Sequence, residues 1–599
     1  MSLSLSSQIK YPSDSSFIKI LSNSDKNNLK SFSYSKIDTT ITNFQNYLPR
    51  NTNGHLGLPS APIYINYQVK ALGFNMYTPP YQNDMISADN VQYFQTKGPY
   101  ASLTGIAGSK QEQLFKLLFS NTFKNKLNIT LAFNRYSGVG FYKHQQSFTN
   151  NFYTSSNYSS KNNRVGYYAY FLYNKVKHQE NGGIANDTLF LENLLINKAL
   201  LPVNLNAAKR EVRNTSLDIN PWFRINKKED SSTVFSHFLD YQFNYSGNYS
   251  KYVDLNSGAE NFYHVFYLDT ATTHDSAHWR SINNGLNYTL KLNPINAKLK
   301  LGYKNEINQV YQYLDSTFSN HFINAGLFIS DKNYSGFVKG NYIFKGSNQS
   351  DYSIEVGNRY TKKIAYDFFK TAFVLNLNAN IEKRHPDFMF NNWVSNHYIW
   401  TNKFLPTEKT QSILSLSTTD NRFDIGVVYQ KVKNFIYYNE QAVPEQTPVS
   451  ITNLSFFIHK DVLLFKHLGI NTKYNYQSSS YQAIISVPKH VVNGALYYQG
   501  NLFKRALQLQ IGFNAQYFSE FYGYAYMPAT NQYYVQTQKT VGNYPFVDFF
   551  LNARIKPVRI FIKIDHVTQG LLGGNYSLTP GYLQNDRAFK FGINWLFFD

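Results

Sequence analysis

The sequence of 599 residues contains no cysteine. Disulfide bonds, thiolate metal sites and a cysteine nucleophile are therefore excluded, although the redox compartment of the protein stays open. Long apolar runs are also missing, because no stretch approaches the ~20 consecutive apolar residues that a membrane-spanning helix requires. The mean hydropathy of -0.41 likewise describes a chain that is polar on average. These absences exclude a helical membrane protein.

Acidic residues are scarce relative to basic ones. The chain has 37 Asp and Glu against 58 Lys and Arg, which gives a formal net charge of +21. In a soluble protein such an excess would suggest nucleic acid or an anionic surface as partner. A secretion signal is not evident, since the opening stretch MSLSLSSQIKYPSDSS lacks a basic n-region and an apolar h-region. Export must therefore be inferred from the rest of the chain.

Aromatic residues are abundant. There are 50 Tyr and 48 Phe, which together with Trp make up 17% of the chain, and Tyr and Phe favour pleated strands and membrane interfaces. In LQLQIGFNAQYF, residues 507–518, apolar side chains alternate with Gln, Gly and Asn. Successive side chains of a strand point to opposite faces, so this strand has one apolar and one polar face. The same alternation recurs at residues 127–133, 239–245, 286–292, 299–303, 352–356 and 547–565.

The length of these segments indicates a membrane. They run to about ten residues, which a tilted strand needs to cross a bilayer, whereas strands of soluble proteins are usually about half as long. Short turns such as NPINA alternate with longer polar stretches, as in outer-membrane barrels. Among structures built of strands, only a closed barrel avoids leaving unpaired backbone groups in hydrocarbon. We therefore predict an all-β fold, a transmembrane antiparallel up-and-down β-barrel of about 16 strands, with a range of roughly 14 to 20.

This pattern divides the chain into two parts. Residues 1–62 show little periodicity and are predicted to form an extended, partly ordered segment that serves as a plug or a periplasmic arm. Residues 63–599 are predicted to form the barrel. Its last strand, FKFGINWLFFD, has to pair with the first strand to close the barrel. We expect lipid to face the alternating apolar side chains of that strand, which are Phe589, Phe591, Ile593, Trp595 and Phe597.

Charged residues that alternate with lipid-facing positions are predicted to point into the lumen. A ring of positive charge in a pore lowers the barrier for anions, so we expect a mild anion preference. The alternative is that these cations pair with lumen carboxylates or with phosphate-bearing lipid at the rims. The pore-lining candidates are Lys298, Lys300, Glu355, Arg359, Arg554, Arg559, Lys563 and Lys590, with Asp565 as a further counter-charge.

Other chemistries have little support. His274, Asp275 and His278 could offer a metal two imidazoles and a carboxylate, but their HDSAH stretch is typical of a solvated loop. Ser and His are plentiful, yet nothing singles out a nucleophile with a base, so we expect neither enzymatic activity nor a cofactor. Aromatics and charges occupy opposite faces, and one surface could not present both to single-stranded nucleic acid. No nucleic-acid partner is therefore expected.

Four stretches together are similar to a known family. They are KIDTTITNFQNYLPRNTNGHLGLPSAP, TKGPYASLTGIAGSKQEQLFKLLFSNTFKNKLNITLAFN, SKNNRVGYYAYFLYNKVKHQENGGI and the final PGYLQNDRAFKFGINWLFFD. On these stretches the chain resembles, nearly end to end, the putative porin family of Bacteroidota outer membranes. The family has a Leu-Gly-Asn-x-Gly stretch where residues 55–59 read HLGLP, so its Asn is missing here. The resemblance implies an outer-membrane β-barrel and brings no catalytic residues.

Two functions follow from this interpretation. The first is a porin that lets small hydrophilic solutes diffuse across the bacterial outer membrane, in contact with its lipid and lipopolysaccharide. The second is a plugged structural barrel that binds other outer-membrane proteins in a larger assembly. The length of the N-terminal segment favours the second, because a polar stretch of that size could fill the lumen.

Overall fold

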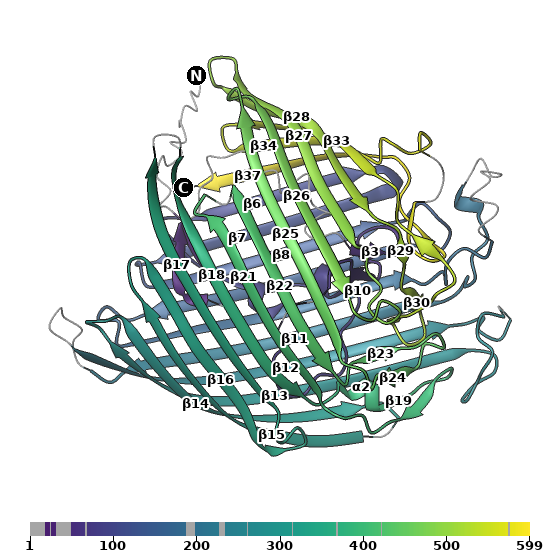
Figure 1. Cartoon of the computed structure of the whole chain (residues 1–599), viewed down its shortest axis with the longest axis horizontal. Coiled ribbons are helices and arrows are strands. Elements are labelled where there is room, and N and C mark those ends of the chain that lie inside the picture. The colour runs from purple at the N-terminus through teal and green to yellow at the C-terminus, as the bar shows by residue number, and fades with distance from the viewer. Residues whose placement is uncertain are drawn as a thin grey trace, which may run out of the picture.

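The computed structural model describes residues 18–23, 25–31, 50–65, 67, 69–186, 198–226, 234–259, 261–313, 315–366, 369–420, 422–572 and 576–598. They form one closed antiparallel barrel of 22 strands, which follow one another around the ring in chain order (Figure 1). No helix in the described ranges is long and apolar enough to cross a membrane. The fold is therefore the predicted antiparallel barrel, with more strands than predicted.

The wall of the barrel consists of long strands joined in hairpins. They are β6 Tyr100–Gly108, β7 Glu112–Phe123, β8 Leu127–Gly138, β9 Ser147–Ser159, β10 Val165–Gln179, β11 Lys209–Arg224, β12 Phe235–Asp254, β13 Thr273–Leu292, β14 Ala297–Tyr311, β15 Asp315–Ser330, β16 Tyr334–Gly346, β17 Tyr352–Tyr366, β18 Phe369–Arg384, β21 Thr407–Thr418, β22 Phe423–Lys433, β25 Ile451–Leu464, β26 Leu468–Ser479, β27 His490–Leu502, β28 Leu507–Phe518, β33 Phe546–Ile555, β34 Val558–Asp565 and β37 Ala588–Phe598.

Smaller elements lie outside the wall sequence. A three-stranded sheet has the order β2-β1-β5, from Asp25–Ser31, Ile18–Ser22 and Gln92–Thr96. The short hairpins are β3 Arg50–Thr52 with β4 Ser60–Pro62, β19 Asn392–Val394 with β20 Ile399–Thr401, β23 Ile436–Tyr438 with β24 Pro444–Gln446, β29 Phe521–Tyr522 with β32 Thr540–Val541, β30 Ala525–Met527 with β31 Gln532–Tyr534, and β35 Ser577–Thr579 with β36 Tyr582–Leu583. Within the described ranges the short helices are η2 Gln82–Asp84, η3 Ala88–Asn90, η4 Ser109–Gln111, η5 Lys198–Leu200 and α2 Phe388–Asn391.

The last strand closes the barrel, as the sequence predicted. One edge of β37 pairs with β34, and the other pairs with β6 from Lys590 opposite Gly108 to Phe598 opposite Tyr100. Burial alternates at every residue of β37, because the period of a strand is two. Closure leaves no unpaired strand edge in the wall.

The predicted number of about 16 strands was wrong. Alternation of apolar and polar residues identifies a strand only where its outer face is apolar. Several strands extend beyond the part of the wall whose outer face is apolar. The first side chains on the outer face of β13 are the exposed polar residues His274, Ser276 and His278, and from the sequence this stretch was predicted to be a loop. Strand β9 consists largely of Ser, Thr and Asn, so its alternation is weak. Turns as short as the two residues 556–557 leave room for additional strands.

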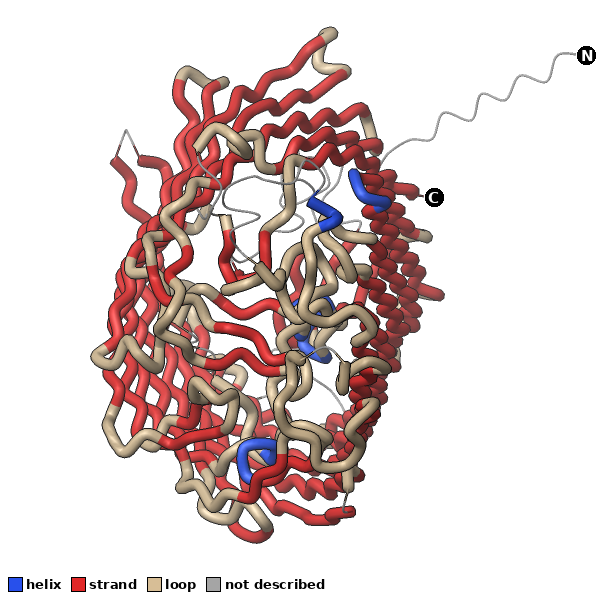
Figure 2. The backbone as a smooth tube through the Cα atoms, turned by 90° about the vertical axis from the view of Figure 1, so that its right-hand side faces the viewer, coloured by secondary structure: helices blue, strands red, loops and turns tan. Residues whose placement is uncertain are grey.

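The two ends of the barrel differ. One end, called here the short-turn end, carries tight connections such as 124–126, 293–296 and 556–557. The other, called here the loop end, carries long connections such as 180–208, 385–406 and 519–545. Figure 2 shows loops and turns, in tan, lying in the space between the strand walls. Any solute that enters from the loop end therefore meets these loops first.

The described residues 50–65 and 69–96, which precede the first barrel strand, lie inside the barrel. The wall begins at Tyr100, not at residue 63, because the stretch before it packs against the inner face of the wall. We call residues 50–96 the interior segment; the other described residues of the predicted segment 1–62 are 18–23 and 25–31. Buried side chains of the interior segment belong to the same hydrophobic clusters as side chains of wall strands around the lumen. These clusters join Ile63 with Val491 and Phe518, Ile65 with Ile451, Leu72 with Phe322 and Ile343, Met76 with Ala277 and Val310, Tyr81 with Val176 and Val212, and Tyr93 with Ala132 and Tyr153.

Candidate functional site

Side chains of the wall also hydrogen-bond the backbone of the interior segment. Asn174 on β10 accepts from the Ile86 N–H and donates to the Ile86 carbonyl oxygen, both at 2.9 Å. Gln477 on β26 accepts from the Ile65 N–H at 3.1 Å and donates to the Ile63 carbonyl oxygen at 2.8 Å. Buried backbone groups need such partners, and amide side chains supply both donor and acceptor. These bonds hold the interior segment across the lumen.

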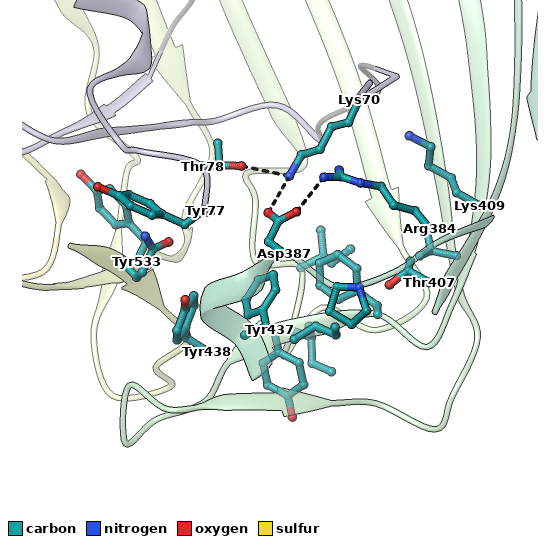
Figure 3. Close-up of a pocket in the computed structure, with 18 of the residues that line it drawn as sticks. Lys70, Tyr77, Thr78, Arg384, Asp387, Thr407, Lys409, Tyr437, Tyr438 and Tyr533 are labelled. Atoms are coloured by element: carbon teal, nitrogen blue, oxygen red, sulfur yellow. Dashed lines mark hydrogen bonds and ion pairs between the residues drawn. The ribbon is translucent and has the colours of Figure 1, made fainter. Parts of the chain in front are cut away.

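A cavity of about 450 Å³ lies between the interior segment and the loops (Figure 3). Its lining comes from the interior segment, the loop-end residues of β18, β21 and β22, and the connections that follow β18, β22, β26 and β28. Small-molecule sites in proteins typically measure roughly 300–1,000 Å³. We call this space the loop-end cavity; its size suits a small solute.

One side of the loop-end cavity carries charge. The Lys70 ammonium lies 2.9 Å from the Thr78 hydroxyl and 3.5 Å from the Asp387 carboxylate. The Arg384 guanidinium donates to the other oxygen of Asp387 at 2.8 Å. Figure 3 shows both cations converging on this carboxylate. The Asp387 carboxylate therefore pairs with two cations.

A second ion pair completes this charged side. Lys409 on β21 lies 2.8 Å from Glu382 on β18, and both side chains are largely buried. The charged lining residues are thus Lys70, Arg384 and Lys409 against Glu382 and Asp387, apart from one histidine. Three cations against two carboxylates leave the cavity with a net charge of +1 when that histidine is neutral.

The opposite side of the cavity is aromatic. Tyr77, Tyr437, Tyr438 and Tyr533 line it, away from Lys409 in Figure 3. The Tyr437 hydroxyl donates to Glu445 at 2.8 Å, and the Tyr533 hydroxyl donates to Asn53 at 3.0 Å. The hydroxyl protons of Tyr437 and Tyr533 are therefore already used within the protein, and these two tyrosines contribute mainly their rings to the cavity.

A buried polar cluster lies beside the cavity. Glu180, which follows β10, accepts from the Tyr526 hydroxyl at 2.8 Å and lies 2.9 Å from His178 Nε2. The Arg210 guanidinium is 3.5 Å from the same carboxylate and donates to the Pro528 carbonyl oxygen. A buried charge is stable only when paired and hydrogen-bonded, and this cluster meets both conditions. It ties the hairpin β30–β31 to the wall.

The same hairpin contacts the interior segment. The Asn531 side chain donates to the Tyr81 hydroxyl at 2.6 Å, and both residues are almost fully buried. Gln532 and Tyr533 of this hairpin line the loop-end cavity. A solute in the cavity would therefore contact an element that is bonded to both the wall and the interior segment.

Two of the predicted pore-lining cations are buried in an ion-pair network. Lys563 lies 2.9 Å from Asp548 and 2.6 Å from Asp565, and Lys590 lies 2.9 Å from both Asp565 and Glu112. We call these five residues the seam cluster, because they span β33, β34, β37 and β7 where the barrel closes. Two cations against three carboxylates give a net charge of −1. The structure therefore places no excess positive charge here.

The other pore-lining candidates are distributed along the wall. Glu355 pairs with Lys339 at 2.9 Å, and Arg559 donates to Asn594 at 3.3 Å. Arg554 donates to Gln508 at 3.0 Å. Lys298 and Lys300 alternate with the exposed Leu299 and Leu301, and Arg359 is exposed on β17. None of these candidates lines the loop-end cavity.

The outer face of β37 is apolar. Its five alternating side chains are 37% to 51% exposed, on the face opposite the buried Lys590 and Asn594; they are Phe589, Phe591, Ile593, Trp595 and Phe597. This is the face that the sequence assigned to lipid. Trp595 and Phe597 stack with ring centroids 4.8 Å apart, close to the short-turn end of the strand.

The HDSAH stretch is part of a strand rather than a loop. His274 and His278 are exposed on one face of β13, whereas Asp275 is buried on the other and accepts from the Asn396 N–H at 2.9 Å. The three side chains therefore do not converge. Within the described ranges no group of three or more His, Asp or Glu is placed to hold a metal ion.

The residues of the loop-end cavity were not among the site residues predicted from the sequence. Arg384 ends strand β18, and the next three residues read HPD. A cluster of charged residues around a proline at the end of an alternating segment was a usable signal, because such positions start functional loops. Lys70 and Tyr77 gave no comparable signal, since their stretch has no regular period.

A loop histidine provides a test of loop packing. The His397 ring stacks on Tyr263 at 3.7 Å, and its nitrogens lie 2.7 Å from the Thr273 hydroxyl and 2.9 Å from the Val265 carbonyl oxygen. Burial lowers the pKa of His397 below its ordinary value of 6.5, against a smaller opposing effect of that carbonyl. When the connection 385–406 is not packed against Tyr263, His397 would take up a proton at a higher pH than it does in the packed state. This packing is therefore fully favourable above pH ~6.5 and weakens as the pH falls below it.

We expect hydrogen exchange in residues 261–272 to accelerate between pH 8 and pH 5, after correction for the intrinsic rate. In His397→Gln this additional acceleration should disappear. His264→Gln is the matched control, because His264 is an exposed histidine of the same loop. Equal pH dependence in the protein and in His397→Gln would contradict the assignment.

The fold and its surfaces define a class of protein. A closed antiparallel barrel with an apolar outer face, a polar inner face, and short turns opposite long loops is the construction of an outer-membrane β-barrel. The chain belongs to the family described as putative porin, whose model matches residues 21–599. Family and fold together point to a bacterial outer membrane.

Solved structures share this fold at low sequence identity. The copper transporter OprC has 11% identity and a TM-score of 0.64, over 98% of this chain and 99% of that one. The FrpB iron transporter of Neisseria meningitidis has 9% identity and a TM-score of 0.60, over 97% and 99%. A mutant of the ferric enterobactin receptor PfeA of Pseudomonas aeruginosa has 10% identity and a TM-score of 0.56, over 85% and 82%. A comparison with curated proteins gives no match.

Proposed function

We propose that the protein is a plugged transport barrel of the outer membrane. In this proposal the loop-end cavity captures a small solute, and the interior segment has to move before the solute passes. The main observation is that the interior segment packs against wall strands around the lumen, from Ile63 on β27 and β28 to Tyr93 on β8 and β9. Long loops of such barrels face the outside, so a solute from outside would reach the cavity first.

The similar structures support a transport role. They are named an iron transporter, a copper transporter and a ferric enterobactin receptor. At 9% to 11% identity the likeness is one of fold, so their substrates are not transferred to this chain. We assign no catalytic role to any residue, and the partners in this proposal are small solutes and the lipids of the outer membrane.

Two alternatives have less support. Free diffusion with anion preference needs an open lumen with unpaired cations, whereas the interior segment crosses the lumen and Lys563 and Lys590 are paired. A purely structural barrel would also be plugged, but it has no need of a charged cavity beneath its loops. That cavity favours transport over a structural role.

The test is single-channel conductance of the purified intact chain in a planar bilayer, with a salt gradient across it. We expect long closed periods without stable steps, because the interior segment is held by buried contacts. Stable open steps with an anion-selective reversal potential would instead establish the passive porin. Closed behaviour together with stoichiometric co-purification of other envelope proteins would favour the structural barrel.

A further inference from the structure

We propose that the loop-end cavity binds a small monocarboxylate that carries a flat apolar body. This inference rests on the proposed function, since it names the class of solute that the plugged barrel captures. It follows from the division of the cavity into a cationic side and an aromatic side.

The cationic side has binding capacity left. Arg384 is 8% exposed, and its Nε has no hydrogen-bond partner among the residues that the structure describes. A buried N–H without an acceptor costs free energy, and a charged donor costs more. Asp387, its ion-pair partner among the described residues, is shared with Lys70. A carboxylate in the cavity that reaches the Arg384 guanidinium would balance the net charge of the cavity.

Guanidinium groups are well suited to this task. The planar guanidinium presents its N–H groups in a fork that matches the two oxygens of a carboxylate, and the charged hydrogen bonds are stronger than neutral ones. Lys409 cannot take this role as readily, because it is already paired with the buried Glu382 at 2.8 Å. Arg384 is therefore the residue we expect to contact the anion.

The aromatic side determines the body of the ligand. Besides the tyrosines, the aliphatic residues Ile484, Ile485 and Val535 line the cavity. The Tyr524 hydroxyl donates to the Ile484 carbonyl oxygen at 3.0 Å, as those of Tyr437 and Tyr533 donate elsewhere in the protein. A sugar, with a hydroxyl on nearly every carbon, would leave many of its own groups without partners here. An aromatic or aliphatic body suits these walls better.

The test uses two probes of the same shape on the intact chain in detergent. Isothermal titration calorimetry should show binding of 4-phenylbutyrate, and binding weaker by about tenfold or more for the neutral 4-phenylbutanamide. This comparison needs no variant and is independent of folding. Equal affinity for both probes, or no binding of either, would overturn the proposal.

Variants then locate the anion. Arg384→Gln should weaken 4-phenylbutyrate binding by about tenfold or more and leave the amide unchanged, while Arg384→Lys should lose less. Lys403→Gln is the matched control, because it removes one positive charge from an exposed site in the connection that follows Arg384. Equal losses in Arg384→Gln and Lys403→Gln would overturn the assignment to Arg384. If the intact chain stays closed in the bilayer and still binds neither probe, only the ligand class fails and the plugged barrel stands.

Discussion

A variant that lacks residues 1–97 should form a permanently open channel. Without the interior segment the lumen would be bounded by the polar inner face of the wall, where Thr130, Asn308 and Asn453 are buried in the intact protein. A wide polar lumen fills with water, as in large outer-membrane barrels. We expect stable conductance steps that are many times larger than any opening of the intact chain. Cells that produce this variant should also admit antibiotics too large for ordinary porins.

Point variants test the same mechanism without shortening the chain. Asn174→Ala combined with Gln477→Ala removes the side chains that bind the backbone of the interior segment. This double variant should open transiently and more often than the intact protein, since each lost hydrogen bond costs ~0.5–1.5 kcal/mol and leaves buried backbone groups unsatisfied. Asn376→Ala with Gln411→Ala is the control, because these amides bond the wall side chains of Ser415 and Gln430.

The deletion result decides whether the interior segment is the barrier. If the shortened protein folds, as judged by its β-sheet circular dichroism and its resistance to unfolding in detergent, and still conducts no ions, the barrier lies elsewhere. The loops at the loop end would then be the remaining candidates. A conducting deletion variant and a closed intact chain together would support the plugged barrel.

Replacing Lys590 by Met should destabilise the barrel by about 3–5 kcal/mol, because removing one partner of a buried ion pair leaves an uncompensated charge. Lys590 is 5% exposed and lies 2.9 Å from both Glu112 and Asp565. The change would remove the Lys590 cation from beside two buried carboxylates, Glu112 on β7 and Asp565 on β34. The free energy of unfolding can be measured by urea titration of the protein in vesicles, followed by tryptophan fluorescence.

Two controls isolate the cause of this loss. Lys590→Met combined with Glu112→Gln removes both charges, and should recover most of the stability because Asp565 keeps Lys563 at 2.6 Å. Lys339→Met breaks an ion pair with Glu355 in which the lysine side chain is 40% exposed, and should cost at most about 1 kcal/mol. Equal effects of Lys590→Met and Lys339→Met would show that burial of the seam cluster does not matter.

Local sequence pattern determined the class of the fold. The period of two is a property of the backbone, so alternation alone showed that Phe589, Phe591 and Ile593 share one face and that Lys590 and Asn594 share the other. The requirement to satisfy every backbone group in lipid then implied closure, and β37 does pair with β6. The stretches that resemble the putative porin family agree with the match over residues 21–599.

The number of strands could not be obtained in this way. Beyond the lipid band a strand no longer needs an apolar outer face, so the start of β13 and most of β9 resemble loops in sequence. The interior segment was equally hidden, because its side chains pack singly against different wall strands and therefore show no regular period. The hypothesis that residues 1–62 fill or cap the lumen rested only on their length and polarity.

Only the tertiary structure decided what the charges do. Lys590 and its partner Glu112 are 478 residues apart in sequence, and Lys70 and Asp387 are 317 apart. Alternation placed Lys590 in the lumen, but whether a lumen cation is open to anions or neutralised depends on which residues barrel closure brings beside it. The loop-end cavity depends on the same long-range contacts, between the interior segment and loops hundreds of residues later. The sequence by itself thus specified two faces and a closed sheet, and the closed sheet then determined which charges are paired and where a solute can bind.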